Sequence, residues 1–117
     1  MLTIRTQQMA VFARAETKKF EDRVLIHLEK FFPAQCKALG ESKLREMIRY
    51  GIKRAAAYGI ATEREVYKYV DLMLVFGRDF DTDKRWPWAG EILRHPRGPA
   101  AKIQALQGAA RKRLKRA

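Results

Sequence analysis

Apolar side chains recur at every third or fourth position along most of this chain, a spacing typical of helices that bury one face. The pattern predicts a first helix over residues 3–32, with His27 on its inward side. Its apolar positions are Met9, Phe12, Ala13, Phe20, Val24, Leu28 and Phe31. Pro33 ends this helix, because proline lacks an N–H donor and clashes with the preceding turn.

A second helix is predicted over residues 42–58 by the same periodicity. Its inner face is formed by Leu44, Met47, Ile48, Ile52, Ala55 and Tyr58, and its outer face by Lys43, Arg45, Arg49, Lys53 and Arg54. Gly59 can adopt the left-handed conformation that closes a helix. Gly51 lies inside the pattern, where glycine costs about 1 kcal/mol relative to alanine, so we expect another helix to approach closely there.

Three further helices are predicted after this one. Thr62 and Glu65 match a capping box, which starts a helix over residues 62–76 whose second half is apolar on all sides. Pro87 suits the first turn of a short helix that ends near residue 94. The last helix begins near residue 100, and its apolar face consists of Ile103, Leu106, Ala110 and Leu114.

These elements predict an all-α fold, a compact four- to five-helix bundle with a basic C-terminal helix or arm. Apolar and polar residues do not alternate over any sustained window, so we expect no sheet. We expect the bundle to span residues 1–98 and the basic helix or arm to span residues 99–117.

The composition narrows the class of protein. A length of 117 residues suits one domain, and no stretch of 18 residues lacks a charge, so no membrane-spanning helix is expected. The first residues do not follow the order of a secretory signal peptide, which favours a cytoplasmic location. Cys36 is the single cysteine, so no intrachain disulfide can form.

Positive charge is concentrated near the C-terminus. The net charge is +12, and residues 94–117 contain eight cations and no acid. A dense cationic cluster attracts nucleic acid, anionic lipid or an acidic protein surface. The predicted polyanion-binding residues are Arg111, Lys112, Arg113, Lys115 and Arg116. A tail that only keeps the protein in solution fits the same pattern equally well.

An acidic cluster precedes two tryptophans. Asp79, Asp81 and Asp83 resemble the first half of a calcium loop, but the glycine and glutamate that such a loop needs are replaced by Lys84 and Gly90. The acids are therefore expected to cap helix ends, or to pair with Arg78, Lys84 and Arg85, and to form an acidic spot for docking.

Trp86 and Trp88 flank Pro87 directly after the acids. Tryptophans commonly anchor protein partners, and they also fill the end of a small bundle. We expect one of them to pack inside and the other to reach the surface. The predicted partner-binding group is Asp79, Asp81, Asp83, Trp86 and Trp88.

Residues with catalytic potential are few. Cys36 is expected to be a buried structural thiol, and His27 and His95 are not spaced as zinc ligands. Asp71 interrupts an apolar run, and a buried ion pair or a hydrogen bond from Tyr67 explains it better than acid–base catalysis. We therefore predict no enzymatic activity, no cofactor and no metal.

Several segments share a pattern with a known group of proteins. They read IRYGIKRAAAYG (48–59), TERE (62–65), YVDLM (69–73), FGRDFDTD (76–83) and WPW (86–88). On these segments, over about residues 20–93, the chain resembles small all-helical proteins of no established activity that are encoded beside spike and toxin genes of bacterial type VI secretion systems. The shared segments contain no catalytic motif, so the resemblance implies a genetic neighbourhood and no reaction.

The predicted function is non-enzymatic binding of another protein, and the favoured partner is a secreted toxin or a spike component. The chain would then act as an adaptor or chaperone, an immunity protein or an accessory part of the delivery apparatus. The alternative is nonspecific nucleic-acid binding through the basic C-terminal arm, which the resemblance does not cover.

Overall fold

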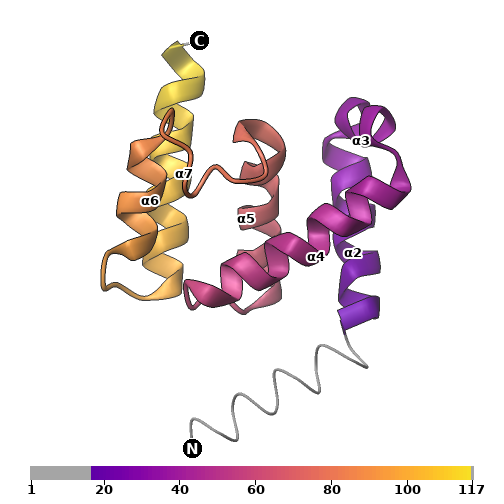
Figure 1. Ribbon diagram of the computed structural model, residues 1–117, viewed down its shortest axis with the longest axis horizontal. Coiled ribbons are helices and arrows are strands. Elements are labelled where there is room, and N and C mark those ends of the chain that lie inside the picture. The colour runs from indigo at the N-terminus through magenta and orange to yellow at the C-terminus, as the bar shows by residue number, and fades with distance from the viewer. Residues whose placement is uncertain (1–16, 117) are drawn as a thin grey trace, which may run out of the picture. The chain divides into compact units, whose positions relative to one another are not determined.

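The computed structural model of this chain describes residues 17–116, and this part is helical without strands. It contains six helices, where four to five were expected, and the chain divides into two units between Ile48 and Arg49. The helices are α2 (Thr17–Phe31), α3 (Pro33–Leu39), α4 (Glu41–Ala57), α5 (Glu63–Phe76), α6 (Pro87–Arg94) and α7 (Pro99–Arg116), as labelled in Figure 1. The all-α prediction is thus confirmed.

The additional helix is α3, which the sequence pattern did not reveal. Pro33 does end α2, but it also occupies the first turn of α3, where a missing N–H is harmless. The carbonyl of Phe32 accepts a hydrogen bond from the Cys36 N–H at 3.0 Å, so helical bonding resumes after a single residue. The part of the first predicted helix that precedes α2, including Met9, Phe12 and Ala13, lies outside the described residues.

The first unit buries the apolar faces of α2, α3 and the beginning of α4. Its buried apolar side chains are Phe20, Val24, Leu25, Leu28, Cys36, Leu44, Met47 and Ile48. His27 is half-buried, and its ring lies 5.0 Å from that of Phe31, measured between centroids. The predicted burial of Cys36 is confirmed.

The second unit begins within α4, where Gly51 makes the close approach expected of it. A Cβ atom built at Gly51 would lie 2.7 Å from the Met73 sulfur and 3.1 Å from a methyl group of Val70, both on α5. Helix α4 ends at Ala57, and the turn that follows contains Gly59, whose φ of +83° is readily adopted only by glycine. The Ile60 N–H donates to the Ala55 carbonyl across this turn at 2.9 Å.

The start of α5 is a partial capping box. The Thr62 hydroxyl accepts a hydrogen bond from the Glu65 N–H at 3.3 Å, as predicted. It also donates to the Glu65 carboxylate at 2.8 Å, so the carboxylate binds the hydroxyl of Thr62. Asp71, which interrupts the apolar run of α5, is half-buried, and its pairing with Tyr67 or a cation stays a prediction.

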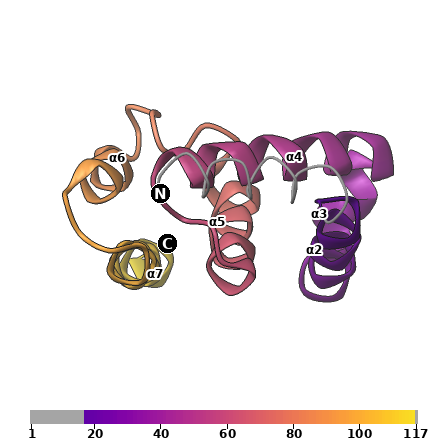
Figure 2. The ribbon, with the colours of Figure 1, turned by 90° about the horizontal axis from the view of Figure 1, so that it is seen from below.

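Helices α5, α6 and α7 lie side by side in the second unit, and α6 runs antiparallel to the other two (Figures 1 and 2). Ile103, Leu106 and Ala110 form the buried face of α7. The predicted C-terminal segment is therefore helical and packs against α5 and α6, while its action as a basic arm stays a prediction. No helix within residues 17–116 is both long and apolar enough to cross a membrane.

Candidate functional site

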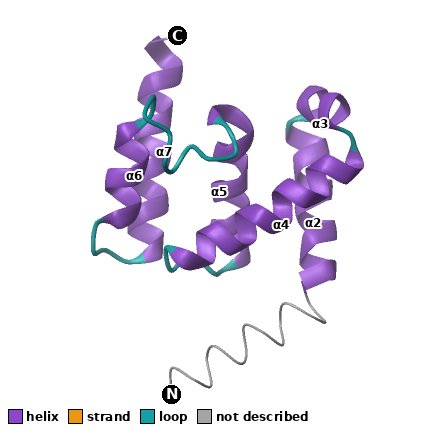
Figure 3. Cartoon of the chain, in the orientation of Figure 1, coloured by secondary structure: helices purple, strands orange, loops and turns teal. Residues whose placement is uncertain are grey.

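The segment between α5 and α6, residues 77–86, is the longest loop in the described part of the chain (Figure 3). It leaves α5 at Gly77, whose φ is +115°, and then folds through consecutive tight turns. Backbone N–H groups of Phe80, Thr82 and Trp86 each donate to a carbonyl three residues earlier, at 3.0–3.2 Å. These turns therefore satisfy much of the loop's backbone hydrogen bonding without regular secondary structure. We call residues 77–86 the anchored loop, because Phe80 and Asp81 are buried in the second unit.

Two neighbouring residues hold this loop from inside the second unit. Phe80 is fully buried, and its ring centroid lies 5.1 Å from that of Tyr69 on α5. Asp81 is 1% exposed, and its carboxylate accepts a hydrogen bond from the Tyr58 hydroxyl at 2.6 Å and forms an ion pair with Arg54. The loop is therefore fastened both to α5 and to the end of α4.

This arrangement corrects two predictions. Asp81 was expected in an acidic docking spot, but its side chain is inside the unit and cannot meet a partner in this conformation. Arg54 was expected on the outer face of α4, but its side chain is only 33% exposed and points its guanidinium at Asp81. A buried carboxylate needs a charge partner, and that requirement draws the arginine inward.

The three side chains around Asp81, those of Arg54, Tyr58 and Tyr69, all have raised pKa values, which favour their protonated forms. Burial, followed by the hydrogen bond to Asp81, raises the pKa of Tyr58 to about 12. Burial, with the charge of Asp81 next, raises the pKa of Tyr69, while pairing with Asp81 raises the pKa of Arg54. Neither phenol nor guanidinium can therefore act as a general base near neutral pH.

The outer side of the anchored loop carries the other two aspartates. Asp79 is exposed and accepts a hydrogen bond from the Tyr50 hydroxyl, while the guanidinium of Arg78 lies over the Tyr50 ring at 4.0 Å. Asp83 accepts hydrogen bonds from the Arg85 backbone at 2.9 Å and from its guanidinium at 2.8 Å. These bonds lower the pKa of Asp83, and they confirm its predicted pairing with Arg85.

The tryptophans differ in exposure, as expected. Trp88 is 8% exposed and packs edge-on against Phe76, with ring centroids 5.3 Å apart. Trp86 is half-buried, and its indole N–H donates to the Phe76 carbonyl at 3.0 Å. Trp88 therefore belongs to the core and drops out of the predicted partner-binding group. The role predicted for Asp79, Asp83 and Trp86 stays a prediction.

A small hollow of about 210 Å³ lies between the anchored loop and α6. Gly90 forms part of its wall, and a Cβ atom there would come within 2.8 Å of the Asp81 backbone carbonyl. The loop and α6 thus touch at a point where only glycine fits without displacement. The remaining lining residues are Asp81, Thr82, Asp83, Lys84, Trp86, Pro87, Glu91 and Arg94.

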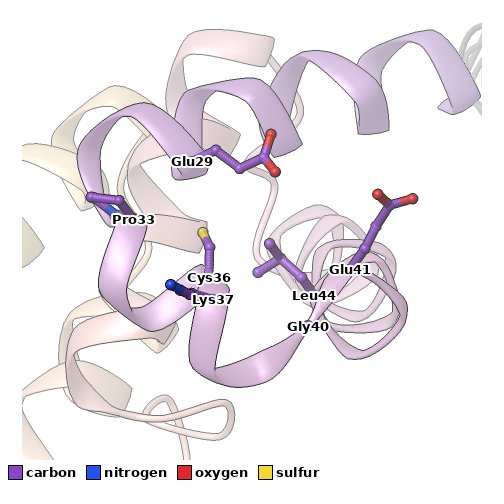
Figure 4. Close-up of a pocket in the computed structure, with 7 residues that line it drawn as sticks. All are labelled: Glu29, Pro33, Cys36, Lys37, Gly40, Glu41 and Leu44. Atoms are coloured by element: carbon purple, nitrogen blue, oxygen red, sulfur yellow. The ribbon is translucent and has the colours of Figure 1, made fainter.

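A larger hollow of about 400 Å³ lies in the first unit, among α2, α3 and the start of α4 (Figure 4). The sulfur of Cys36 points toward the segment of α2 that carries Glu29. Burial, with the charge of Glu29 next, raises the pKa of the Cys36 thiol, which disfavours the nucleophilic thiolate. The lining residues are Glu29, Pro33, Cys36, Lys37, Gly40, Glu41 and Leu44.

The predicted polyanion-binding residues occupy the last turns of α7. Arg111, Lys112 and Arg113 are exposed. The side chains of Lys115 and Arg116 lie outside the described part of the structure. Within residues 17–116, no three acidic, histidine or cysteine side chains are grouped so that they could hold a metal ion.

Sequence reasoning missed Arg54, Tyr58 and Tyr69 as the surroundings of Asp81. One signal was present, because Tyr50, Arg54 and Tyr58 recur every four residues and therefore lie along one face of α4. Comparison of the chain with protein-family models, with curated proteins and with solved structures finds no match in any of the three.

Proposed function

We propose that this chain is a non-enzymatic protein-binding protein that presents the anchored loop to its partner. The partner we propose is a secreted toxin or a spike component of a type VI secretion system, with the chain acting as adaptor or chaperone, immunity protein or accessory part. The resemblance over about residues 20–93 motivates this choice of partner. The observation that carries the binding role is the burial of Phe80 and Asp81 within an otherwise irregular loop.

Burial of Asp81 is costly unless its charge is compensated, and the compensation here comes from α4. The result is a loop whose backbone is held in one conformation while Asp79, Thr82 and Lys84 remain exposed. Loops fixed on a rigid support commonly carry recognition, since a pre-ordered loop loses little conformational entropy on binding. The half-buried indole of Trp86 adds an aromatic contact at the edge of this surface.

The state of the titratable groups supports a role without catalysis. The raised pKa values of Cys36, Tyr58 and Tyr69 keep these side chains protonated near neutral pH. The Oδ2 oxygen of Asp81 accepts hydrogen bonds from both Tyr58 and Arg54. These groups stabilise the fold, which leaves the exposed surface of the loop for recognition.

The test is co-purification with the products of the genes beside this one, among which the proposal requires a toxin or spike protein, followed by calorimetry on any complex. The loop variant is Asp79→Lys combined with Thr82→Arg, both exposed positions. The matched control is Glu46→Lys combined with Gln104→Arg, which changes the net charge equally at exposed positions elsewhere.

We expect the loop variant to weaken the complex by at least about tenfold, since it disturbs the centre of the interface. The control variant should bind as the wild type does, and both should keep the wild-type unfolding midpoint. Failure of every neighbouring gene product to bind the wild type, or equal binding by the two variants, overturns the proposal.

A further inference from the structure

The two units of the chain carry unequal charge. Residues 49–117 contain 16 cations and seven acids, whereas residues 1–48 contain nine cations and six acids. Two of the seven acids are neutralised internally, Asp81 by Arg54 and Asp83 by Arg85. The uncompensated positive charge therefore belongs mainly to the second unit, and its densest part is the end of α7.

The basic end of α7 continues a helix whose earlier turns are packed inside the second unit. Ile103, Leu106 and Ala110 are buried against the rest of the second unit. Near the start of the helix, the Lys102 ammonium donates to the Tyr58 carbonyl at 2.9 Å. The exposed cations that follow Ala110 are thus continuous with a helix of fixed position, which favours a preformed binding surface.

The number of cations exceeds what the helix itself needs. One or two cations in the last turn favourably oppose the helix dipole. Here five of the six residues 111–116 are basic, which places like charges at the i, i+4 pairs Arg111–Lys115 and Lys112–Arg116. Such pairs destabilise a helix on its own, and a bound polyanion removes the repulsion.

The end of α7 also contacts the pair formed by the two tryptophans of the second unit. The guanidinium of Arg113 lies 5.8 Å from the centre of the Trp88 ring, and that of Arg85 lies 5.6 Å from the Trp86 ring. The two rings are themselves 6.5 Å apart. Contacts therefore link the end of α7 to Arg85 at the end of the anchored loop, although these residues lie 28 positions apart in the sequence.

The chemistry of this surface favours nucleic acid over the other polyanions. A membrane-binding helix must offer an apolar face to the lipid, but the apolar face of α7 is already buried, apart from Leu114, which is 54% exposed. An acidic peptide offers carboxylates at irregular spacing, whereas a nucleic acid offers a continuous row of phosphates. The consecutive, exposed side chains of Arg111, Lys112 and Arg113 suit such a row.

We infer that the C-terminal end of α7, formed by the exposed Arg111, Lys112 and Arg113, binds the phosphate backbone of nucleic acid without sequence preference. The inference does not rest on the proposed protein-binding function. Phosphate contacts give affinity that falls steeply with salt and depends little on whether the strand is single or paired.

The test measures fluorescence anisotropy of a labelled 20-base-pair DNA duplex and of a 20-nucleotide oligothymidine between 50 and 200 mM NaCl. The test variant is R111E/K112E/R113E. The control variant is K18E/K19E/K43E, which makes the same change of net charge at exposed positions of the first unit. Phosphatidylserine vesicles serve as the lipid probe, and circular dichroism checks that both variants are folded.

We expect wild type and control to bind both DNA probes, with the control weakened less than about threefold. The α7 variant should lose at least about tenfold in affinity, and its plot of log affinity against log salt should flatten by about 2–3 units. Three results would each overturn the inference: no binding of DNA by the wild type, equal weakening in both variants, or vesicle binding as tight as DNA binding. The α7 variant is also tested for capture of the toxin or spike partner. If it still captures this partner, then loss of DNA binding and loss of the proposed protein binding are distinguishable.

Discussion

Both units use an arginine of α4 to bind carboxylates, but the surroundings of the two arginines differ. In the first unit Arg45 donates to Glu21 at 2.7 Å, to Asp22 at 2.8 Å and to Glu41 at 3.1 Å. Asp22 and Glu41 retain contact with solvent, although Glu21 is buried. In the second unit Arg54 binds Asp81, whose side chain has no contact with solvent.

The difference in exposure changes what each network contributes. Water can replace a lost partner around Arg45, because most of its network lies at the surface. Water does not reach the Asp81 carboxylate, so the charge depends on Arg54 and Tyr58. The same pair of residue types therefore joins two helices loosely in one unit and fixes a loop firmly in the other. Four experiments separate these roles.

The largest effect is expected from Asp81→Ala. Removing the carboxylate leaves the Arg54 guanidinium without its partner and frees the anchored loop from α4. Loss of one member of a buried pair costs about 3 kcal/mol in the free energy of unfolding. Urea unfolding followed by Trp fluorescence measures this loss, since Trp86 is the last residue of the loop. Asp83→Ala is the control, because its ion pair is at the surface; equal midpoints for the two variants would contradict the comparison.

The second largest effect is expected where α6 contacts the anchored loop, at Gly90. Gly90→Ala places a Cβ atom within 2.8 Å of the Asp81 carbonyl, a backbone atom that cannot move aside alone. We expect a loss of about 1–2 kcal/mol, despite the better helix propensity of alanine. Gly108→Ala, in the open on α7, should instead stabilise by up to about 1 kcal/mol. Thermal unfolding of both variants decides; a gain in stability for Gly90→Ala would mean that the loop is not held against α6.

The contrast between the networks also explains what the sequence could and could not predict. The boundaries of α4, α5, α6 and α7 and the close approach at Gly51 follow from local spacing, and the structure reproduces them. The pairing of Asp83 with Arg85 is also local, since the residues are two positions apart. Arg54 and Asp81 are 27 positions apart, and only the packing of α4 against the loop brings them together. The recurrence of Tyr50, Arg54 and Tyr58 marks one face of α4, but it does not identify the residue of the loop that this face binds.

Helix α3 was missed for a different reason. Pro33 was interpreted as the end of helical structure, but proline stops only the helix that precedes it and is well suited to begin another. The segment after it is too short to show a periodic apolar face, because Cys36 is its one buried residue. A start signal without a following pattern could not be distinguished from a loop.

The third effect concerns the network of the first unit. Arg45→Met removes three charge-assisted bonds but keeps an aliphatic side chain at this position. We expect less than half the loss caused by Asp81→Ala, since water can hydrate Asp22 and Glu41. The loss should shrink further in 1 M NaCl, where exposed pairs are screened. Urea unfolding at low and high salt measures it. A loss as large as that of Asp81→Ala, and insensitive to salt, would show that buried Glu21 dominates this network.

The smallest effect is the pH dependence of the bond between Tyr58 and Asp81. The pKa of Tyr58 is raised to about 12 in the folded protein, by burial and then by this bond, while an unfolded tyrosine titrates near pH 10. A raised pKa means that folding favours the neutral phenol, so the contribution is complete below about pH 10 and is lost as the pH rises toward 12. Tyr58→Phe lacks this contribution at every pH.

The difference in unfolding midpoint between wild type and Tyr58→Phe should therefore be constant from pH 7 to 9.5 and narrow by pH 11. Tyr69, whose pKa is also raised, is present in both proteins, so its titration does not account for any narrowing. A difference that stays constant up to pH 11 would show that Asp81 holds the loop through Arg54 alone.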